Sequence, residues 1–77
     1  MSNIPQISGQ ELIKALKKIG FEVSRQKGSH IRLARSYKNQ KQLITIPNHK
    51  VIRKGTLLQG ILKPIDLTIE DLKRLLK

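Results

Sequence analysis

Residues 21–46 read FEVSRQKGSHIRLARSYKNQKQLITI, and this stretch decides the fold. Apolar and polar residues alternate over 21–25 and again over 29–35, and β-branched residues gather over 42–46, as is typical of strands. The Lys27-Gly28 pair between the first two segments is a turn signal, and the residues over 36–40 are typical of a polar loop. Three strands joined by such short connections predict an antiparallel meander.

The same alternation predicts which strand residues face the core. His30 and Arg32 alternate with Ile31 and Leu33, so the two polar side chains are expected to project from the opposite, open face of the sheet. The residues expected on the buried face are Phe21, Val23, Ile31, Leu33, Ile44 and Ile46. A small sheet of this kind buries only one face beneath its helices.

A helix is predicted before the sheet. Ser8 and Glu11 have the spacing of a capping box, and apolar residues then recur at helical spacing over 9–19. Gly20 suits the left-handed residue that closes a helix. The segment over 1–7 is expected to be a flexible N-terminus.

Two short helices are predicted after the sheet. A basic loop over 47–54 leads to a helix that opens near Gly55 and ends at Lys63, because Pro64 restricts the residue before it. Thr68-Ile69-Glu70-Asp71 then resembles a second capped helix start. The expected order is α-β-β-β-α plus a short C-terminal helix, an α+β fold within one domain over 1–77.

The charge distribution points to a polyanionic partner. The 77 residues carry a net charge of +11 and include no cysteine, which excludes disulfides and cysteine–zinc sites. No carboxylate lies between Val23 and Ile65, and like charges repel unless a partner offsets them. The cations of this stretch are Arg25, Lys27, Arg32, Arg35, Lys38, Lys41, Lys50, Arg53, Lys54 and Lys63. They favour a nucleic-acid surface over a merely solvated face.

No membrane or secretory segment is expected. No apolar run approaches the roughly 20 residues that span a bilayer, and the N-terminus lacks the basic and apolar regions of a signal peptide. We therefore expect a cytoplasmic protein without membrane contact.

The two histidines are the candidates for chemistry. Neither has a partner at metal-ligand spacing, and no cofactor motif is present, so no metal and no small-molecule cofactor are expected. A histidine can exchange a proton at neutral pH, and RNA carries its own nucleophile, the 2′-OH, beside each phosphate. A metal-free ribonuclease could therefore be built from His30 with Arg25, Lys27 and Arg32. His30 could equally be an ordinary surface residue.

Four further residues are candidate RNA contacts. His49, Lys50 and Lys54 lie in the predicted basic loop, where they could bind phosphate or simply be solvated. Ser29 could hydrogen-bond near the site or merely begin a strand after the turn. Aromatic residues are scarce, so RNA contact is expected to rely on phosphates, 2′-hydroxyls and shape rather than on base stacking.

Several separated motifs together resemble one known family. They are Glu11-Leu12-Ile13-Lys14, Gly20-Phe21, Arg25-Gln26-Lys27-Gly28-Ser29-His30, Ile46-Pro47-Asn48-His49, Lys54-Gly55-Thr56-Leu57 and Ile61-Leu62. With this spacing the chain resembles the HicA toxins of HicA–HicB toxin–antitoxin systems, the YcfA-like family, from about Ser8 to Lys73. It departs from the family pattern at Pro64-Ile65-Asp66-Leu67, which affects the expected C-terminal helix and partner geometry more than the site.

The resemblance implies a fold and an activity. The fold would be that of double-stranded-RNA-binding domains, and the activity that of an mRNA interferase that arrests translation. The histidine of the Gly-Ser-His motif, here His30, would be catalytic, and a HicB-type antitoxin would bind the toxin and cover it. Two alternatives remain open: a non-catalytic double-stranded-RNA-binding module of the same fold, and a basic ribosomal protein.

Overall fold

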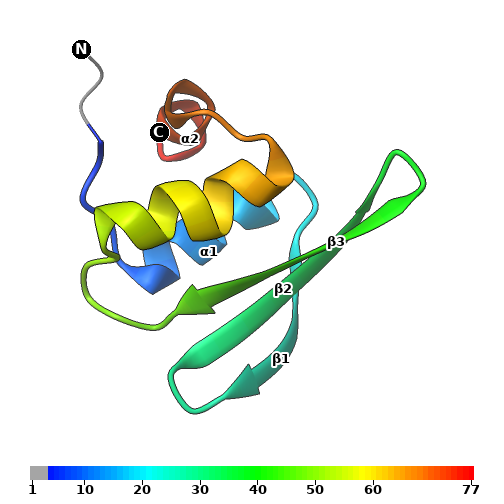
Figure 1. The fold of residues 1–77 in the computed structure, drawn as a ribbon, viewed down its shortest axis with the longest axis horizontal. Helices are drawn as coiled ribbons and strands as arrows, with labels where there is room; N and C mark the ends of the chain where they lie inside the picture. Colours follow the sequence, from blue (N-terminus) through cyan, green and yellow to red (C-terminus); the bar gives the residue numbers. More distant parts are fainter. Residues whose placement is uncertain (1–3) are drawn as a thin grey trace.

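Two consecutive antiparallel hairpins form the centre of the molecule (Figure 1). In the computed structural model, which describes residues 4–77, the sheet has the strand order β1-β2-β3. The strands are β1 (Glu22–Lys27), β2 (His30–Tyr37) and β3 (Gln40–Pro47); the helices are α1 (Gly9–Lys17), η1 (Thr56–Leu62), η2 (Lys63–Ile65) and α2 (Ile69–Leu75). The predicted α+β class and antiparallel meander are confirmed, and the arrangement is that of a double-stranded-RNA-binding-like fold.

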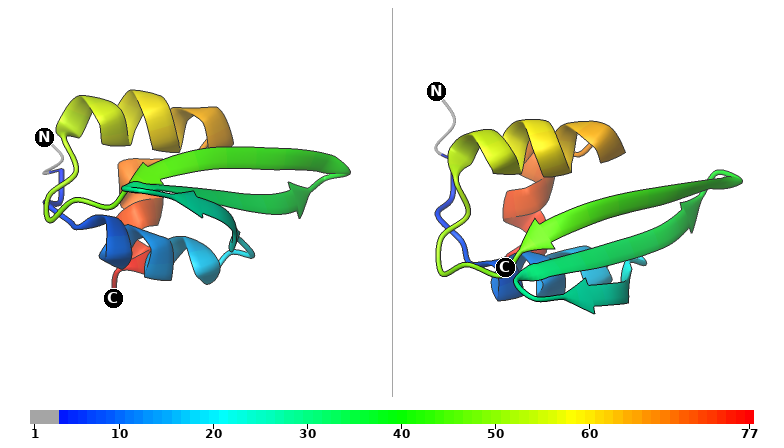
Figure 2. Two further views of the ribbon diagram at one scale, coloured as in Figure 1. Left: turned by 90° about the horizontal axis from the view of Figure 1, so that it is seen from below. Right: turned by 60° about the horizontal axis from the view of Figure 1, so that its bottom comes forward.

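The helices cover one face of the sheet. Ile31, Leu33, Ile44 and Ile46 are each at most 4% exposed, as the alternation predicted, and they pack with apolar residues of all the helices. β3 contacts both α1 and η1, which Figure 2 shows at the end of the sheet away from the β2–β3 turn. His30 and Arg32 are exposed, so the open face predicted from the sequence is present.

The prediction for Val23 is wrong. Val23 is 45% exposed although it pairs with the buried Leu33, and every residue of β1 is exposed. The helices make their main sheet contacts with β3, so β1 lies at the edge that they leave uncovered. The register also shifts between Val23 and Arg25, which breaks the alternation read from the sequence.

The second hairpin is longer than predicted. The expected loop over 36–40 is mostly strand, and only Lys38 and Asn39 form the turn, with φ of 52° and 63°. Positive φ at both central residues is the pattern of a type I′ turn, whose twist matches that of the strands it joins. The polar composition of 36–40 therefore belongs to exposed strand positions and not to a loop.

The first helix begins as predicted and ends two residues early. Both hydrogen bonds of the Ser8–Glu11 capping box are present. After Lys17 the chain tightens, since the Gly20 N–H binds the carbonyl three residues back, and Gly20 has a φ of 102°. Residues 1–3 of the expected flexible N-terminus lie outside the described residues, whereas Ile7 is 5% exposed and its carbonyl accepts the Ile52 N–H.

Helical structure continues through Pro64, contrary to the prediction that it ends at Lys63. η1 is a wide π-helix whose last hydrogen bond runs from the Lys63 N–H to the Leu58 carbonyl. Lys63 keeps helical dihedrals, and Pro64, which has no N–H but a compatible φ, sits in the 3₁₀ turn η2. The helical path ends instead at Asp66, which is left-handed with a φ of 54°.

The last helix has the predicted capping box. The side chain of Thr68 accepts the Asp71 N–H, and the Asp71 carboxylate accepts the Thr68 N–H. These hydrogen bonds lower the pKa of Asp71 below its ordinary value because they favour the ionised carboxylate. The hydrogen bond from the Thr68 backbone has the largest effect. Capping thus occupies two of the five acids, Glu11 and Asp71.

Candidate functional site

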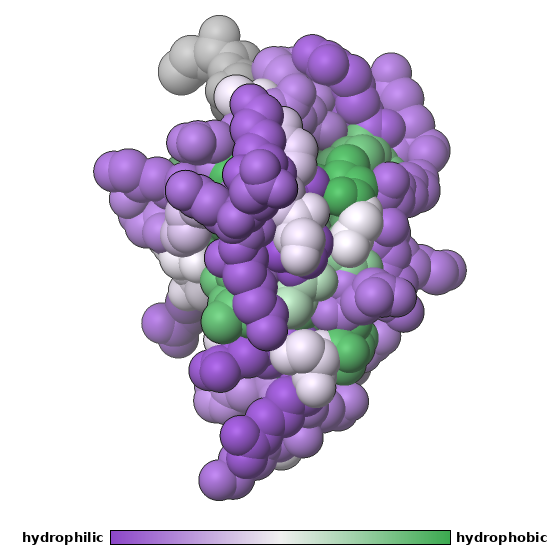
Figure 3. All heavy atoms as spheres, turned by 90° about the vertical axis from the view of Figure 1, so that its right-hand side faces the viewer, coloured by the Kyte–Doolittle hydropathy of each residue, from purple (hydrophilic) through white to green (hydrophobic). Residues whose placement is uncertain are grey.

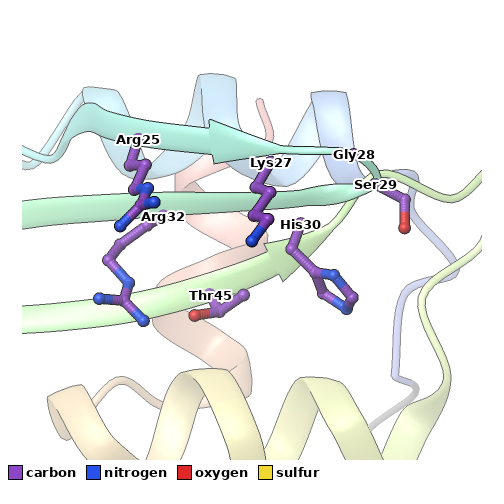
Figure 4. A pocket seen from close by; sticks show the side chains of 7 residues that line it. All are labelled: Arg25, Lys27, Gly28, Ser29, His30, Arg32 and Thr45. Carbon is purple, nitrogen blue, oxygen red and sulfur yellow. The ribbon is translucent and has the colours of Figure 1, made fainter.

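Two rows of side chains lie side by side on the open face of the sheet. Strand pairing places Lys27, His30 and Pro47 in one row, and Arg25, Arg32 and Thr45 in the next. Directly paired residues of an antiparallel sheet point to the same face, so these rows lie opposite the buried isoleucines. A hollow in this face is lined by Arg25, Lys27, Gly28, Ser29, His30, Arg32 and Thr45 (Figure 4).

The tight β1–β2 turn brings most of these residues together. Gly28 has a φ of 58°, which glycine adopts without the strain of a Cβ, and the two-residue turn pairs Lys27 directly with His30. The Ser29 carbonyl accepts the Asn48 N–H at 2.7 Å, which extends the pairing of β2 with β3 past Pro47. In Figure 4 the Ser29 hydroxyl lies apart from the His30 ring, at the turn end of the hollow.

The His30 imidazole lies among cations and has no hydrogen-bond partner within residues 4–77. Within residues 4–77 no side chain or backbone group hydrogen bonds to its ring, and no carboxylate lines the hollow. Lys27 pairs with it across the hairpin, and Arg25 and Arg32 occupy the adjacent row. The ring is therefore open to a bound molecule, and the cations beside it suit an anion.

Within the described residues 4–77, the cations of this face form no ion pairs. Among the described residues the two salt bridges join Lys73 to Glu70 and Arg74 to Asp71, both within α2. Glu22 is the acid on β1, but it lies one row beyond Arg25, opposite Ala34. The positive charge of Arg25, Lys27 and Arg32 is consequently available to a ligand.

The structure separates the predicted site residues into two groups. Arg25, Lys27, Ser29 and Arg32 line the same hollow as His30. The other three predicted contacts, His49, Lys50 and Lys54, are exposed in the connection between β3 and η1 and do not line it. Thr45 was not predicted, although its place between the buried Ile44 and Ile46 is a signal that could have identified it.

The segment after β3 is anchored to the first turn of α1. The Gly9 N–H binds the His49 carbonyl at 2.9 Å, and Gln10 Nε2 binds Asn48 Oδ1 at 3.1 Å. A Cβ on Gly9 would lie 2.3 Å from the Pro47 carbonyl oxygen, a backbone atom. Because Pro47 pairs with His30, this contact supports one side of the hollow.

We expect Gly9→Ala to destabilise the fold by about 1–3 kcal/mol, since the new methyl forces β3 away from α1. Urea unfolding followed by circular dichroism measures the loss. Gly60→Ala is the matched control, because a Cβ there would meet its nearest atom, a Thr56 methyl, at 4.0 Å. An unchanged unfolding midpoint for Gly9→Ala would contradict the close approach of α1 to Pro47.

Within residues 4–77 no three His, Asp or Glu side chains are grouped so that they could hold a metal ion. Each helix of the described chain is too short or too polar to cross a membrane.

Comparison with known proteins identifies the family. No curated protein and no solved structure matches the chain. A family model described as the HicA toxin of bacterial toxin–antitoxin systems matches residues 9–67, which include all three strands and the hollow around His30. The resemblance seen in the sequence is thereby confirmed, and toxins of such systems act with a cognate antitoxin. The chain belongs to the HicA family of bacterial toxins.

Proposed function

We propose that this toxin is an endoribonuclease that cleaves mRNA and so arrests translation. The observation that carries the proposal is the exposed His30 imidazole, which has no hydrogen-bond partner in the part of the chain that the structure describes and lies beside Arg25, Lys27 and Arg32. A polyanion would bind to these cations with its phosphates next to a group that can exchange a proton near neutral pH.

In the proposed reaction the nucleophile comes from the RNA. The 2′-OH attacks the adjacent phosphorus and loses its proton, while the P–O bond to the 5′-oxygen of the next nucleotide breaks and that oxygen gains a proton. His30 carries one of these two proton transfers as general base or general acid, and water carries the other. Arg25, Lys27 and Arg32 stabilise the charge that develops on the phosphorane oxygens. The products are a 2′,3′-cyclic phosphate and a 5′-OH, and neither a metal nor a small-molecule cofactor takes part.

The remaining predicted residues hold the RNA or shape the site. Ser29 ties the start of β2 to the segment after β3, because its carbonyl accepts the Asn48 N–H. His49, Lys50 and Lys54 lie outside the hollow, so we propose that they contact phosphates beyond the cleaved one.

The proposed partner is a HicB-type antitoxin that covers His30. A carboxylate-rich surface would complement the uncompensated cations of the open face and would exclude RNA from it. With mRNA as the substrate, the proposed site of action is the cytoplasm.

Incubation of the purified chain with an end-labelled mRNA transcript, with and without EDTA, tests the proposal. We expect fragments that end in a 2′,3′-cyclic phosphate or its hydrolysis product, and we expect EDTA to leave the rate unchanged. Fragments with 5′-phosphates would refute the 2′-OH chemistry, and inhibition by EDTA would refute metal independence. RNA binding without cleavage would instead support the non-catalytic double-stranded-RNA-binding module.

A further inference from the structure

The β2–β3 hairpin projects beyond the rest of the sheet. The pairing of β1 with β2 extends only as far as Glu22 and Ala34. The pairing of β2 with β3 continues beyond that point to Tyr37 and Gln40. Residues 35–42 therefore form a two-stranded extension, which we call the ribbon, and it reaches out to the right in Figure 1. Figure 3 looks toward this end of the molecule, where hydrophilic residues predominate.

Arg35 fixes the ribbon to the body of the protein. Its Nη1 donates to the Ile19 carbonyl at 2.9 Å, and its Nε donates to Gln42 Oε1 at 2.6 Å. The guanidinium carbon lies 4.7 Å from the centroid of the buried Phe21 ring and 4.3 Å from that of Tyr37. These contacts hold the base of the ribbon in one direction, so it can present charges at a fixed distance from the site.

The ribbon carries two exposed cations without carboxylate partners in the described chain. Lys41 pairs with Ser36, two rows beyond Arg32, and therefore lies on the same face as His30. Lys38 is at the tip, with its Nζ 5.4 Å from the centroid of the Tyr37 ring. The intervening row of Glu22, Ala34 and Leu43 contains no cation. Lys41 on the open face and Lys38 at the tip thus form a second set of positive charge, separate from the cations around His30.

We propose that the ribbon is a second RNA-binding surface, at which Lys38 and Lys41 hold phosphates distant from the cleaved bond. Ser36 lies six positions beyond His30 in β2, which corresponds to about 20 Å along a strand. This distance is roughly six stacked nucleotides at about 3.4 Å each. The ribbon would make the enzyme favour RNA long enough to reach both sets of cations. This inference rests on the proposed ribonuclease function.

The test compares two RNAs and two double variants. The substrates are a labelled tetranucleotide, which is too short to reach the ribbon from His30, and a labelled 20-nucleotide RNA. The test variant is Lys38→Gln with Lys41→Gln. The control is Lys14→Gln with Lys17→Gln, which removes the same charge from exposed positions on α1, behind the sheet in Figure 4. Melting curves establish that both variants are folded.

We expect the ribbon variant to raise KM for the 20-nucleotide RNA roughly tenfold near 0.15 M salt and to leave kcat unchanged. The salt dependence of its binding should fall by about 1.4 in slope, the contribution of two phosphate contacts on a single strand. KM for the tetranucleotide should be unchanged, and the control variant should resemble the wild type with both RNAs.

The outcomes separate the two proposals. Equal KM values for the ribbon and control variants with the 20-nucleotide RNA would overturn the ribbon proposal and leave the ribonuclease intact. If the wild type cleaves neither RNA, the ribonuclease proposal fails, and the same comparison made with Kd from fluorescence anisotropy decides the ribbon's role. If the ribbon variant keeps normal RNA kinetics but escapes the antitoxin, the ribbon binds protein and not RNA.

Discussion

His30→Ala is expected to lower kcat/KM for RNA cleavage by about 100-fold or more, with RNA affinity almost unchanged. Among the residues that line the hollow, His30 carries the side chain that most often serves as a general acid or base. RNA binding depends on the summed charge of the cations, so the loss of one histidine should change it little. Because the ring is exposed and makes no hydrogen bond within the described chain, its loss should leave stability unchanged within about 0.5 kcal/mol.

Induction of the wild type and of His30→Ala in a bacterial host measures the effect in cells. We expect growth arrest and fragmented mRNA from the wild type alone. His49→Ala is the matched control, since this second histidine is exposed but lies outside the hollow, and it should remain toxic. If His30→Ala were as toxic as the wild type, toxicity would come from the basic surface, and the assignment of His30 would be wrong.

Phe21→Ala is expected to unfold the domain. Phe21 is 1% exposed, and truncation of a buried phenylalanine costs about 3–5 kcal/mol. A domain of this size has only about 3–5 kcal/mol of net stability, so the loss removes nearly all of it. The variant also removes the ring against which Arg35 packs, which frees the base of the ribbon.

Urea unfolding followed by circular dichroism measures this loss, with His30→Ala as the background so that the protein can be expressed without toxicity. Val23→Ala is an informative control because the sequence pattern placed both residues in the core. Val23 is 45% exposed, and its truncation should change stability by no more than about 0.5 kcal/mol. Equal losses for the two variants would show that β1 is covered after all.

The agreement between sequence and structure is greatest where the determining interactions are local. Both capping boxes join residues three apart in the chain, and both are present. The alternation of Ile31 and Leu33 with His30 and Arg32 is a property of the extended backbone itself, and the structure keeps it. These local rules were enough to predict the meander and its open face.

The errors arise where a distant part of the chain decides. Val23 alternates like a core residue, but no helix reaches the edge that β1 occupies. Residues 36–40 have the composition of a loop, yet pairing with the partner strand extends both strands to the turn at Lys38 and Asn39. Pro64 resembles a helix stop, but it fits a 3₁₀ turn that continues η1.

In the candidate site, too, some residues were predictable from local sequence and others were placed by contacts between distant parts of the chain. The sequence by itself determined that Arg25, Lys27, Ser29 and Arg32 accompany His30, because one tight hairpin with alternating side chains brings them together. Only the tertiary structure decided that Thr45 joins this hollow while His49, Lys50 and Lys54 lie outside it. Those positions depend on the pairing of β3 with β2 and on the anchoring of the following segment to α1, and such contacts between distant residues leave no mark in local sequence.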